Sequence, residues 1–323
     1  MSLLSRHPGG RYAQTVCVET ALVKRWVSMA VLALCLAATE SQAQQPGSSA
    51  ADAFRPSLSL TPYYQGKADL DGGGSYSAVG AITRLRVTNR LGDKGFWGLT
   101  LNYDYTDYRF SEVSAFGGQA PWNNMQRVGF GVPFNWITGK WGWLVAPSVD
   151  YFRETGADWN DSLTYGAVFS GARMFSSGRL GLGLGVFNRL EEVEVFPFIA
   201  VDWRLSENWR LTNPLAAGPT GPAGLEAIYA FASGWQIGVG GAYRSVRFRL
   251  NENGPIASGV GEEQGIAGFV HLTRALHKRM ALDLYAGAIF NGRLKVEDSR
   301  GNTLSEVDYD TAPLVGLTFT AKF

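Results

Sequence analysis

The sequence has little cysteine, little histidine and almost no net charge, and these shortages exclude several classes of protein. Its 323 residues include two Cys and three His, and 29 Lys and Arg are balanced by 28 Asp and Glu. Because this balance provides no net positive field for phosphates, the composition argues against a nucleic-acid-binding protein. The longest uncharged apolar-rich run, 26–39, is shorter than the roughly 18 residues of a transmembrane helix, which excludes a bundle of membrane helices.

The N-terminal part of the chain has the features of a secretory signal peptide. Lys24 and Arg25 form a charged region, 27–38 forms an apolar region, and Ser41-Gln42-Ala43 provides the small residues of a cleavage site. We therefore expect export from the cytoplasm, with cleavage after Ala43.

This interpretation sets the expected domain boundaries. Residues 1–43 are an N-terminal extension plus signal peptide, with translation starting at Val23, and 44–53 are a short periplasmic lead to a domain at 54–323. Both cysteines precede residue 44. The exported protein would therefore contain neither a disulfide nor a thiolate-ligated metal.

Beyond residue 54, apolar residues alternate with small or polar residues at a period of two. This period is typical of β-strands with one apolar face. It is clearest in the segments 97–105, 128–136, 143–151 and 180–186. The sequence therefore predicts an all-β protein.

The breaks between the alternating segments are of two lengths, and their order predicts the architecture. Short turns are expected at 91–95, 138–140, 176–179, 206–208, 233–234 and 275–278. Longer connections are expected at 66–75, 111–123, 154–161, 191–194, 214–223, 251–263 and 298–302. Six turns and seven connections join about 14 strands (12 to 16 possible), which is the plan of a transmembrane antiparallel up-and-down β-barrel. Closure removes the sheet edge that lipid could not hydrogen-bond.

Tryptophan provides a test of this architecture that does not depend on the turns. Seven indoles lie close to the short turns, where a ring can contact lipid while its N–H stays near water. They are Trp97, Trp136, Trp141, Trp143, Trp203, Trp209 and Trp235. We expect them to form an aromatic girdle at the periplasmic interface of the outer membrane.

The last segment of the chain alternates up to an aromatic C-terminal residue, with Val315, Leu317, Phe319 and Phe323 in one phase. This pattern resembles the C-terminal assembly signature of bacterial outer-membrane proteins. The resemblance implies recognition by the barrel-assembly machinery and a location in the outer membrane of a Gram-negative bacterium.

A second resemblance is more local. Asn213-Pro214-Leu215 and the following stretch 218–226 are similar to a recurrent segment of porin-like barrels that are described only as a domain of unknown function. This similarity implies a fold without a known activity.

Charged residues in the phase opposite to the apolar face are expected to line the lumen, because a charge directed into lipid is costly. These residues are Arg84, Arg86, Asp104, Arg127, Asp150, Asp202, Glu226, Arg244 and Asp283. Glycines in the same phase, such as those at 181, 183 and 185, add no bulk and favour an open lumen. The connection 111–123, with Phe116 and Trp122, has the length to fold inward as a constriction.

Two features resemble functional sites, one catalytic and one for Ca²⁺, and each also has a simpler interpretation. His271 and Thr273 share one strand face, as in outer-membrane phospholipases, but they lie next to a short turn and lack the serine nucleophile. An ordinary interfacial histidine fits better. Asp69 and Asp71, which precede three glycines, could bind Ca²⁺ but lack the remaining positions of a calcium loop. We expect no catalytic, cofactor or metal site.

The sequence therefore predicts a passive outer-membrane channel for small hydrophilic solutes, with a lumen lined by charges of both signs. Alternatives are a transporter or binder of an apolar ligand, and a structural barrel in which the same charges form internal ion pairs. A lipid-hydrolysing enzyme fits the sequence less well. The rival fold is a secreted β-sandwich.

Electrophoresis separates the two folds. An intact membrane barrel resists dodecyl sulfate until it is boiled, so the unboiled protein should migrate differently from the boiled one. Identical migration of the two samples would favour the β-sandwich.

Overall fold

The computed structural model describes residues 54–323, and the expected signal peptide and periplasmic lead lie outside them. The described chain forms sixteen β-strands and two 3-10 helices. Their bounds are β1 Arg55–Asp69, β2 Ser75–Arg90, β3 Gly95–Ser111, η1 Ser114–Phe116, β4 Asn124–Gly131, β5 Phe134–Thr138, β6 Trp141–Arg153, η2 Asn160–Ser162, β7 Leu163–Phe175, β8 Gly178–Arg189, β9 Val193–Arg204, β10 Trp209–Thr212, β11 Ala223–Ala232, β12 Trp235–Arg249, β13 Val260–His277, β14 Met280–Glu297, β15 Thr303–Tyr309 and β16 Ala312–Lys322.

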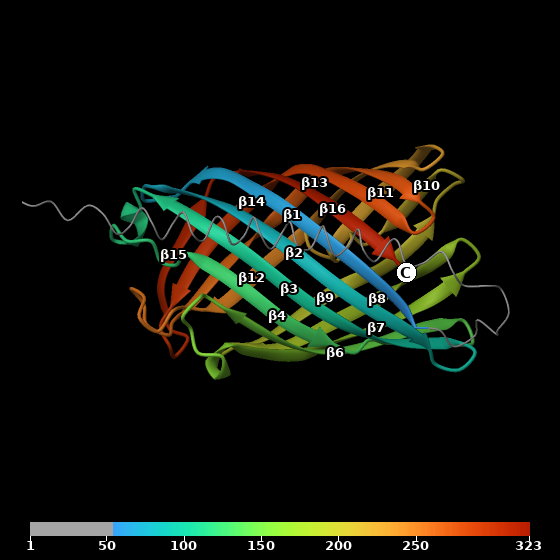
Figure 1. Ribbon diagram of the computed structural model, residues 1–323, viewed down its shortest axis with the longest axis horizontal. Coiled ribbons are helices and arrows are strands. Elements are labelled where there is room, and N and C mark those ends of the chain that lie inside the picture. The colour runs from blue at the N-terminus through green and yellow to red at the C-terminus, as the bar shows by residue number, and fades with distance from the viewer. Residues whose placement is uncertain (1–53) are drawn as a thin grey trace, which may run out of the picture. The chain divides into compact units, whose positions relative to one another are not determined.

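The strands form a closed antiparallel barrel (Figure 1). Consecutive strands pair with each other, and β16 returns to pair with β1 from Ser57↔Lys322 to Gln65↔Leu314. Two wall strands are interrupted. β4 and β5 are two parts of one strand, separated at 132–133, and both pair with β3 and β6. β15 and β16 are likewise two parts of one strand, and both pair with β14. Counting each interrupted strand once gives fourteen wall strands. The prediction of a fourteen-stranded up-and-down barrel is confirmed.

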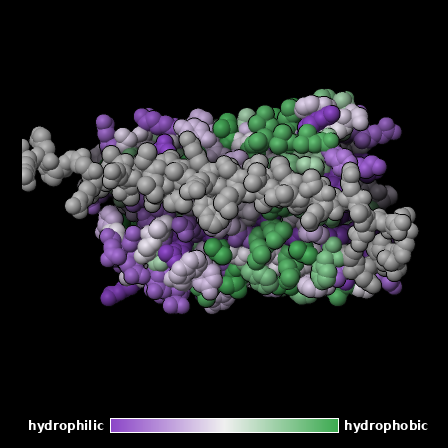
Figure 2. All heavy atoms as spheres, in the orientation of Figure 1, coloured by the Kyte–Doolittle hydropathy of each residue, from purple (hydrophilic) through white to green (hydrophobic). Residues whose placement is uncertain are grey.

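The outer surface of the barrel carries large apolar side chains that are fit for lipid. Figure 2 shows hydrophobic residues gathered over the half of the barrel nearer the short turns and hydrophilic residues at the other end. Between 43% and 72% of the surface of each of these side chains is exposed: Leu101, Phe130, Phe169, Leu182, Val239 and Leu284. Water would make this exposure costly, whereas the hydrocarbon of a membrane matches it.

All six expected short turns lie at one end of the barrel, here called the short-turn end, and the seven connections leave the strands toward the other, long-loop end. In outer-membrane barrels these ends face the periplasm and the exterior, respectively. Trp136, Trp141, Trp143 and Trp209 are 37–46% exposed at the short-turn end, where the sequence places the girdle. The described residues contain no helix of sufficient length and hydrophobicity to cross a membrane.

The interior of the long-loop end is packed with side chains. An aromatic cluster, in which rings contact one another at 4.9–6.4 Å between centroids, consists of Tyr76, Tyr108, Phe110, Phe116, Trp122, Phe248 and Tyr309. Trp122, from the connection between β3 and β4, is 1% exposed within it. The inward fold of this connection agrees with the expectation from its length, but it fills the lumen end rather than narrowing it.

A buried carboxylate organises the polar groups of this cluster. Glu263 on β13 accepts hydrogen bonds from the hydroxyls of Tyr76 (3.2 Å) and Tyr108 (2.9 Å) and from the amide of Gln65 (3.0 Å). Arg244 Nη2 lies 3.6 Å from the same carboxylate. Because Glu263 is 1% exposed, these partners are what makes its burial tolerable.

The inward glycines do not leave the open space that the sequence suggests. A Cβ on Gly183 would lie 2.1 Å from the ring of Phe198, and one on Gly185 would lie 2.9 Å from the ring of Phe187. Aromatic rings from β8 and β9 therefore cover this glycine stripe. The prediction that glycine adds free volume is wrong here, because neighbouring side chains take the space.

Close strand packing at Gly181 gives a test of this wall. A Cβ there would lie 2.0 Å from the carbonyl oxygen of Gly171, so Gly181→Ala should lower the free energy of unfolding by about 1–3 kcal/mol. Gly241→Ala is the matched control, since the nearest atom to its new Cβ lies 3.7 Å away. The measurement is the temperature at which the unboiled band disappears from a dodecyl sulfate gel. Equal temperatures for the two variants would contradict this packing.

Candidate functional site in the lumen

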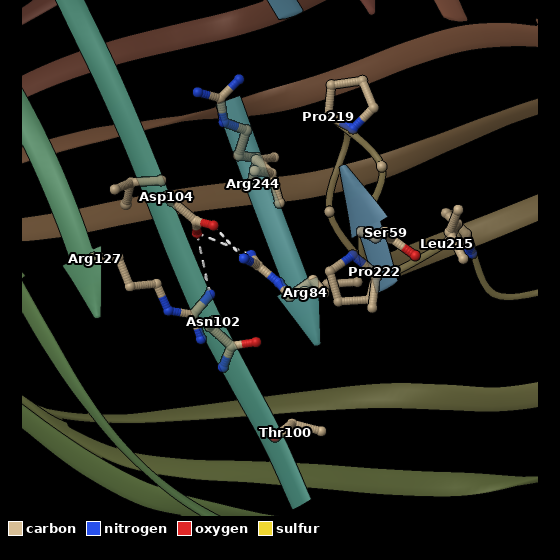
Figure 3. Close-up of a pocket in the computed structure, with 18 of the residues that line it drawn as sticks. Ser59, Arg84, Thr100, Asn102, Asp104, Arg127, Leu215, Pro219, Pro222 and Arg244 are labelled. Atoms are coloured by element: carbon tan, nitrogen blue, oxygen red, sulfur yellow. Dashed lines mark hydrogen bonds and ion pairs between the residues drawn. The ribbon is translucent and has the colours of Figure 1, made fainter. Parts of the chain in front are cut away.

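Four of the expected lumen residues form a continuous charge ladder, defined as Arg84, Asp104, Arg127 and Asp150. Arg84 Nη2 donates to Asp104 Oδ2 at 2.9 Å. Arg127 Nη1 donates to the same oxygen at 3.4 Å, and Arg127 Nε donates to Asp150 Oδ1 at 2.7 Å. Figure 3 shows both arginines directed at Asp104 across neighbouring strands. The ladder contains two positive and two negative side chains, so its net charge is zero.

The structure distributes the other expected lumen residues over several places. Arg86 lines the same cavity as the ladder, and Arg244 reaches it from β12 while contacting the Glu263 carboxylate. Asp202 lies near the short-turn end, where it accepts a hydrogen bond from Arg210 Nε at 2.7 Å. Glu226 and Asp283 line a second cavity. The placement of these nine side chains as lining of a working channel stays a prediction.

The segment that connects β10 to β11, residues 213–222, lies inside the barrel and is here called the inner segment. Its Ala217 carbonyl oxygen accepts a hydrogen bond from Thr61 Oγ1 at 2.7 Å. Thr61 Oγ1 in turn lies 2.8 Å from Thr318 Oγ1, which joins the first and last wall strands. The sequence-based expectation of an outer connection at 214–223 is therefore wrong.

Proline explains why this segment leaves the wall. β10 ends at Thr212 after four residues, and Pro214, Pro219 and Pro222 follow within ten. Proline has no N–H to donate to a strand ladder, so the segment cannot continue β10 along β9. In the lumen its carbonyl groups can still find side-chain donors such as Thr61.

The ladder cavity, of about 760 Å³, lies between the charge ladder and the inner segment. Figure 3 shows Leu215, Pro219 and Pro222 of the inner segment beside Ser59 of β1. Its apolar lining includes Ile82, Phe152, Phe196, Leu215, Pro219, Pro222 and Val246. The lining therefore combines the charged side chains of the ladder with apolar side chains from the same strands and from the inner segment, an arrangement that suits an amphipathic molecule.

A second cavity, of about 470 Å³, opens on the other side of the inner segment near the short turns. His271 contacts Glu226 in its wall, and both side chains are at least 94% buried. Thr273 Oγ1 donates to Asp283 Oδ1, and Tyr285 lies beside them. His271 thus faces the lumen and is not an interfacial histidine.

Leu215 and Asn213 line both cavities. The inner segment is therefore the partition between them. The described residues contain no group of three or more His, Asp or Glu side chains arranged to bind a metal ion. Asp69 instead lies 3.4 Å from Lys67 Nζ.

Sequence reasoning missed apolar residues that line the site. Phe196 and Leu215 were not identified because their position depends on where β10 ends. The signal available was the spacing of Pro214, Pro219 and Pro222, which is incompatible with a wall strand.

The closed wall, its apolar outer surface and its cavity-bearing lumen define a bacterial outer-membrane β-barrel. More specifically, the model of the family described as "Domain of unknown function (DUF6268)" matches residues 42–310, and the chain belongs to this family. No curated protein matches the sequence.

Several solved barrels are similar in fold. An outer-membrane channel from Pseudomonas putida F1 is 10% identical, with a TM-score of 0.45 over 87% of this chain and 100% of that one. A toluene transporter from P. putida, TodX, is 10% identical, with a TM-score of 0.39 over 84% of this chain and 90% of that one. The translocator domain of the autotransporter NalP from Neisseria meningitidis is 10% identical, with a TM-score of 0.30 over 95% and 97%.

The charge ladder predicts a large difference between two aspartate variants. Asp104→Asn leaves Arg84 without its carboxylate in a site that is about 80–90% buried, and should lower the free energy of unfolding by about 3 kcal/mol. Asp202→Asn removes the partner of the half-exposed Arg210 and should cost less than about 1 kcal/mol. Urea unfolding in lipid vesicles, followed by tryptophan fluorescence, measures both. Similar losses in the two variants would contradict a ladder that braces the wall.

Proposed function

We propose that this protein carries an apolar or amphipathic small molecule across the outer membrane through the ladder cavity. The observation that carries the proposal is the mixed charged and apolar lining of that cavity. Leu215, Pro219 and Phe196 supply apolar surface, and the charge ladder faces them. An apolar body gains free energy on leaving water for such a wall, at about 25 cal/mol per Å².

The packed long-loop end supports this proposal over passive diffusion of hydrophilic solutes. Phe248, Leu294 and Val296 are fully buried in the region that a straight aqueous path would cross. The ladder charges also neutralise one another at hydrogen-bonding distance, so they leave little field for guiding ions. A hydrophilic channel would need a continuous water-filled lumen at this level.

The inner segment controls the movement of the carried molecule between the two cavities. It lies between the two cavities, and Leu215 is the apolar side chain that lines both of them. We expect Leu215 to act as the apolar contact at this point.

Entry of the fluorescent apolar amine 1-N-phenylnaphthylamine into cells tests the proposal. Cells of a Gram-negative strain that express the protein should take up the dye faster than cells without it. Leu215→Asp should slow the protein-dependent part by about fivefold, the factor that corresponds to a loss of about 1 kcal/mol of apolar contact.

Leu304→Asp is the matched control, because Leu304 is 57% exposed on β15 and lines neither cavity. It should leave dye entry unchanged. Absence of any protein-dependent entry, together with steady ion conductance of the purified protein in a planar bilayer, would instead establish a hydrophilic channel.

A further inference from the structure

The barrel wall contains an opening between β9 and β12, here called the side gap, that follows from the shortness of β10. β10 pairs with β9 only from Arg210↔Arg204 to Thr212↔Asp202. β11 begins at Ala223, opposite Tyr243 of β12. Beyond these points, toward the long-loop end, the structure records no strand between the β9 segment 193–198 and the β12 segment 244–249 within the described chain.

Asn213 closes the lower limit of the side gap. Its Nδ2 donates to the carbonyl oxygens of Ile199 on β9 (2.7 Å) and Gly224 on β11 (2.9 Å), and its Oδ1 accepts from Val201 N (3.0 Å). One side-chain amide therefore replaces the missing strand at this level.

Arg247 closes the upper limit. Its guanidinium donates to the carbonyl oxygens of Arg189 (3.0 Å) and Leu190 (3.0 Å) at the tip of the β8–β9 hairpin. Arg247 is 1% exposed although its phase places it on the outer side of β12, because this hairpin covers it. A hydrogen bond from Arg189 Nη1 to Ser245 Oγ (3.1 Å) joins the two sides just below.

The edge of β9 at the side gap contains a proline that removes one unpaired backbone donor. The bonds of Asn213 to Ile199 and Val201 show that odd-numbered residues of β9 direct their backbone groups toward the gap. The next odd-numbered residue is Pro197, which has no N–H to leave unsatisfied there. The three prolines of the inner segment likewise prevent it from returning to the wall.

The side gap lies at the level of the apolar outer surface and reaches the ladder cavity. On its outer rim, Val195 and Ile199 of β9 are 55% and 45% exposed and Tyr243 of β12 is 40% exposed. Phe196 from one side and Tyr243 and Ser245 from the other also line the ladder cavity. At this place the ladder cavity therefore approaches the apolar outer surface of the barrel, below the Arg189 side chain, which pairs with Glu194 and Ser245.

We propose that the side gap is a lateral port between the membrane and the ladder cavity for small apolar molecules. This inference rests on the proposed function and specifies the route. A strand of a second chain is the other conceivable occupant of the free β9 edge. The free stretch from Val195 to Phe198 spans only about 13 Å at 3.3 Å per residue, and Pro197 has no N–H to donate to a partner strand. A second strand would therefore form few hydrogen bonds there, which favours a small molecule as the occupant.

A removable block at the outer rim tests the port. Residues 54–323 contain no cysteine, so Val195→Cys provides the single thiol of the barrel, on a side chain that faces the membrane without lining the cavity, and Cys17→Ser and Cys35→Ser remove the two thiols that precede the barrel. Modification with a pyrene methanethiosulfonate should abolish most of the protein-dependent entry of 1-N-phenylnaphthylamine, and a reducing agent should restore it. Val270→Cys, whose native side chain is 45% exposed on the outer face of β13, should show no effect when modified in the same way.

The outcomes separate the port from the proposed function. Unchanged entry after complete modification of Val195→Cys would overturn the port while leaving transport through the cavity intact. A disulfide-linked dimer of Val195→Cys that forms in cells, with unchanged dye entry, would assign the free edge to a second chain and also overturn it. Absence of protein-dependent entry in the unmodified parent protein would overturn the proposed function itself.

Discussion

An unpaired backbone polar group is costly where a barrel wall faces lipid, and the side chain of Asn213 pairs such groups at the level where β10 ends. Its amide bonds to β9 and β11 at once. Without this bridge, Ile199, Val201 and Gly224 would each present an unpaired backbone group at the level where β10 ends. The inner segment, the two cavities that it separates and the side gap above it all depend on this substitution of a side chain for a strand.

The two ends of the lumen are stabilised by different interactions. At the long-loop end, an aromatic cluster surrounds Glu263 and gives the barrel a packed core of the kind found in soluble proteins. Nearer the short turns, the charge ladder braces the wall with paired side chains and leaves space beside it. The mixed charges of the lumen are thus mainly structural at the ladder, where each arginine has a carboxylate within hydrogen-bonding distance.

The fold could be predicted from the sequence because its signals are local. Alternation at 128–136 and the turns at 138–140 and 176–179 depend on neighbouring residues, and together they fix the number of wall strands and the direction of each. The phase of Arg84 and Asp104 likewise follows from one strand each. In contrast, the role of Gly183 could not be predicted, because the ring that covers it comes from Phe198 on the next strand.

The site was harder to predict for the same reason. The position of Leu215 depends on a chain that leaves the wall and crosses the lumen, and a pattern of period two contains no information about that path. The prolines at 214, 219 and 222 excluded a strand, but an outer loop satisfied them equally well. His271 was assigned to an interface because its partner, Glu226, is 45 residues away in the sequence.

A second anchor ties the inner segment to the seam at which the barrel closes. Thr61 belongs to the first wall strand and Thr318 to the last. Because the one hydroxyl hydrogen of Thr61 is donated to the Ala217 carbonyl oxygen, Thr318 is the hydrogen-bond donor to Thr61. This chain of hydroxyls is complete once the two ends of the sheet have met. In an open sheet Asn213 could already bind β9 and β11, whereas only the closed barrel brings Thr61 opposite Ala217, so the complete anchoring of residues 213–222 requires the closed seam.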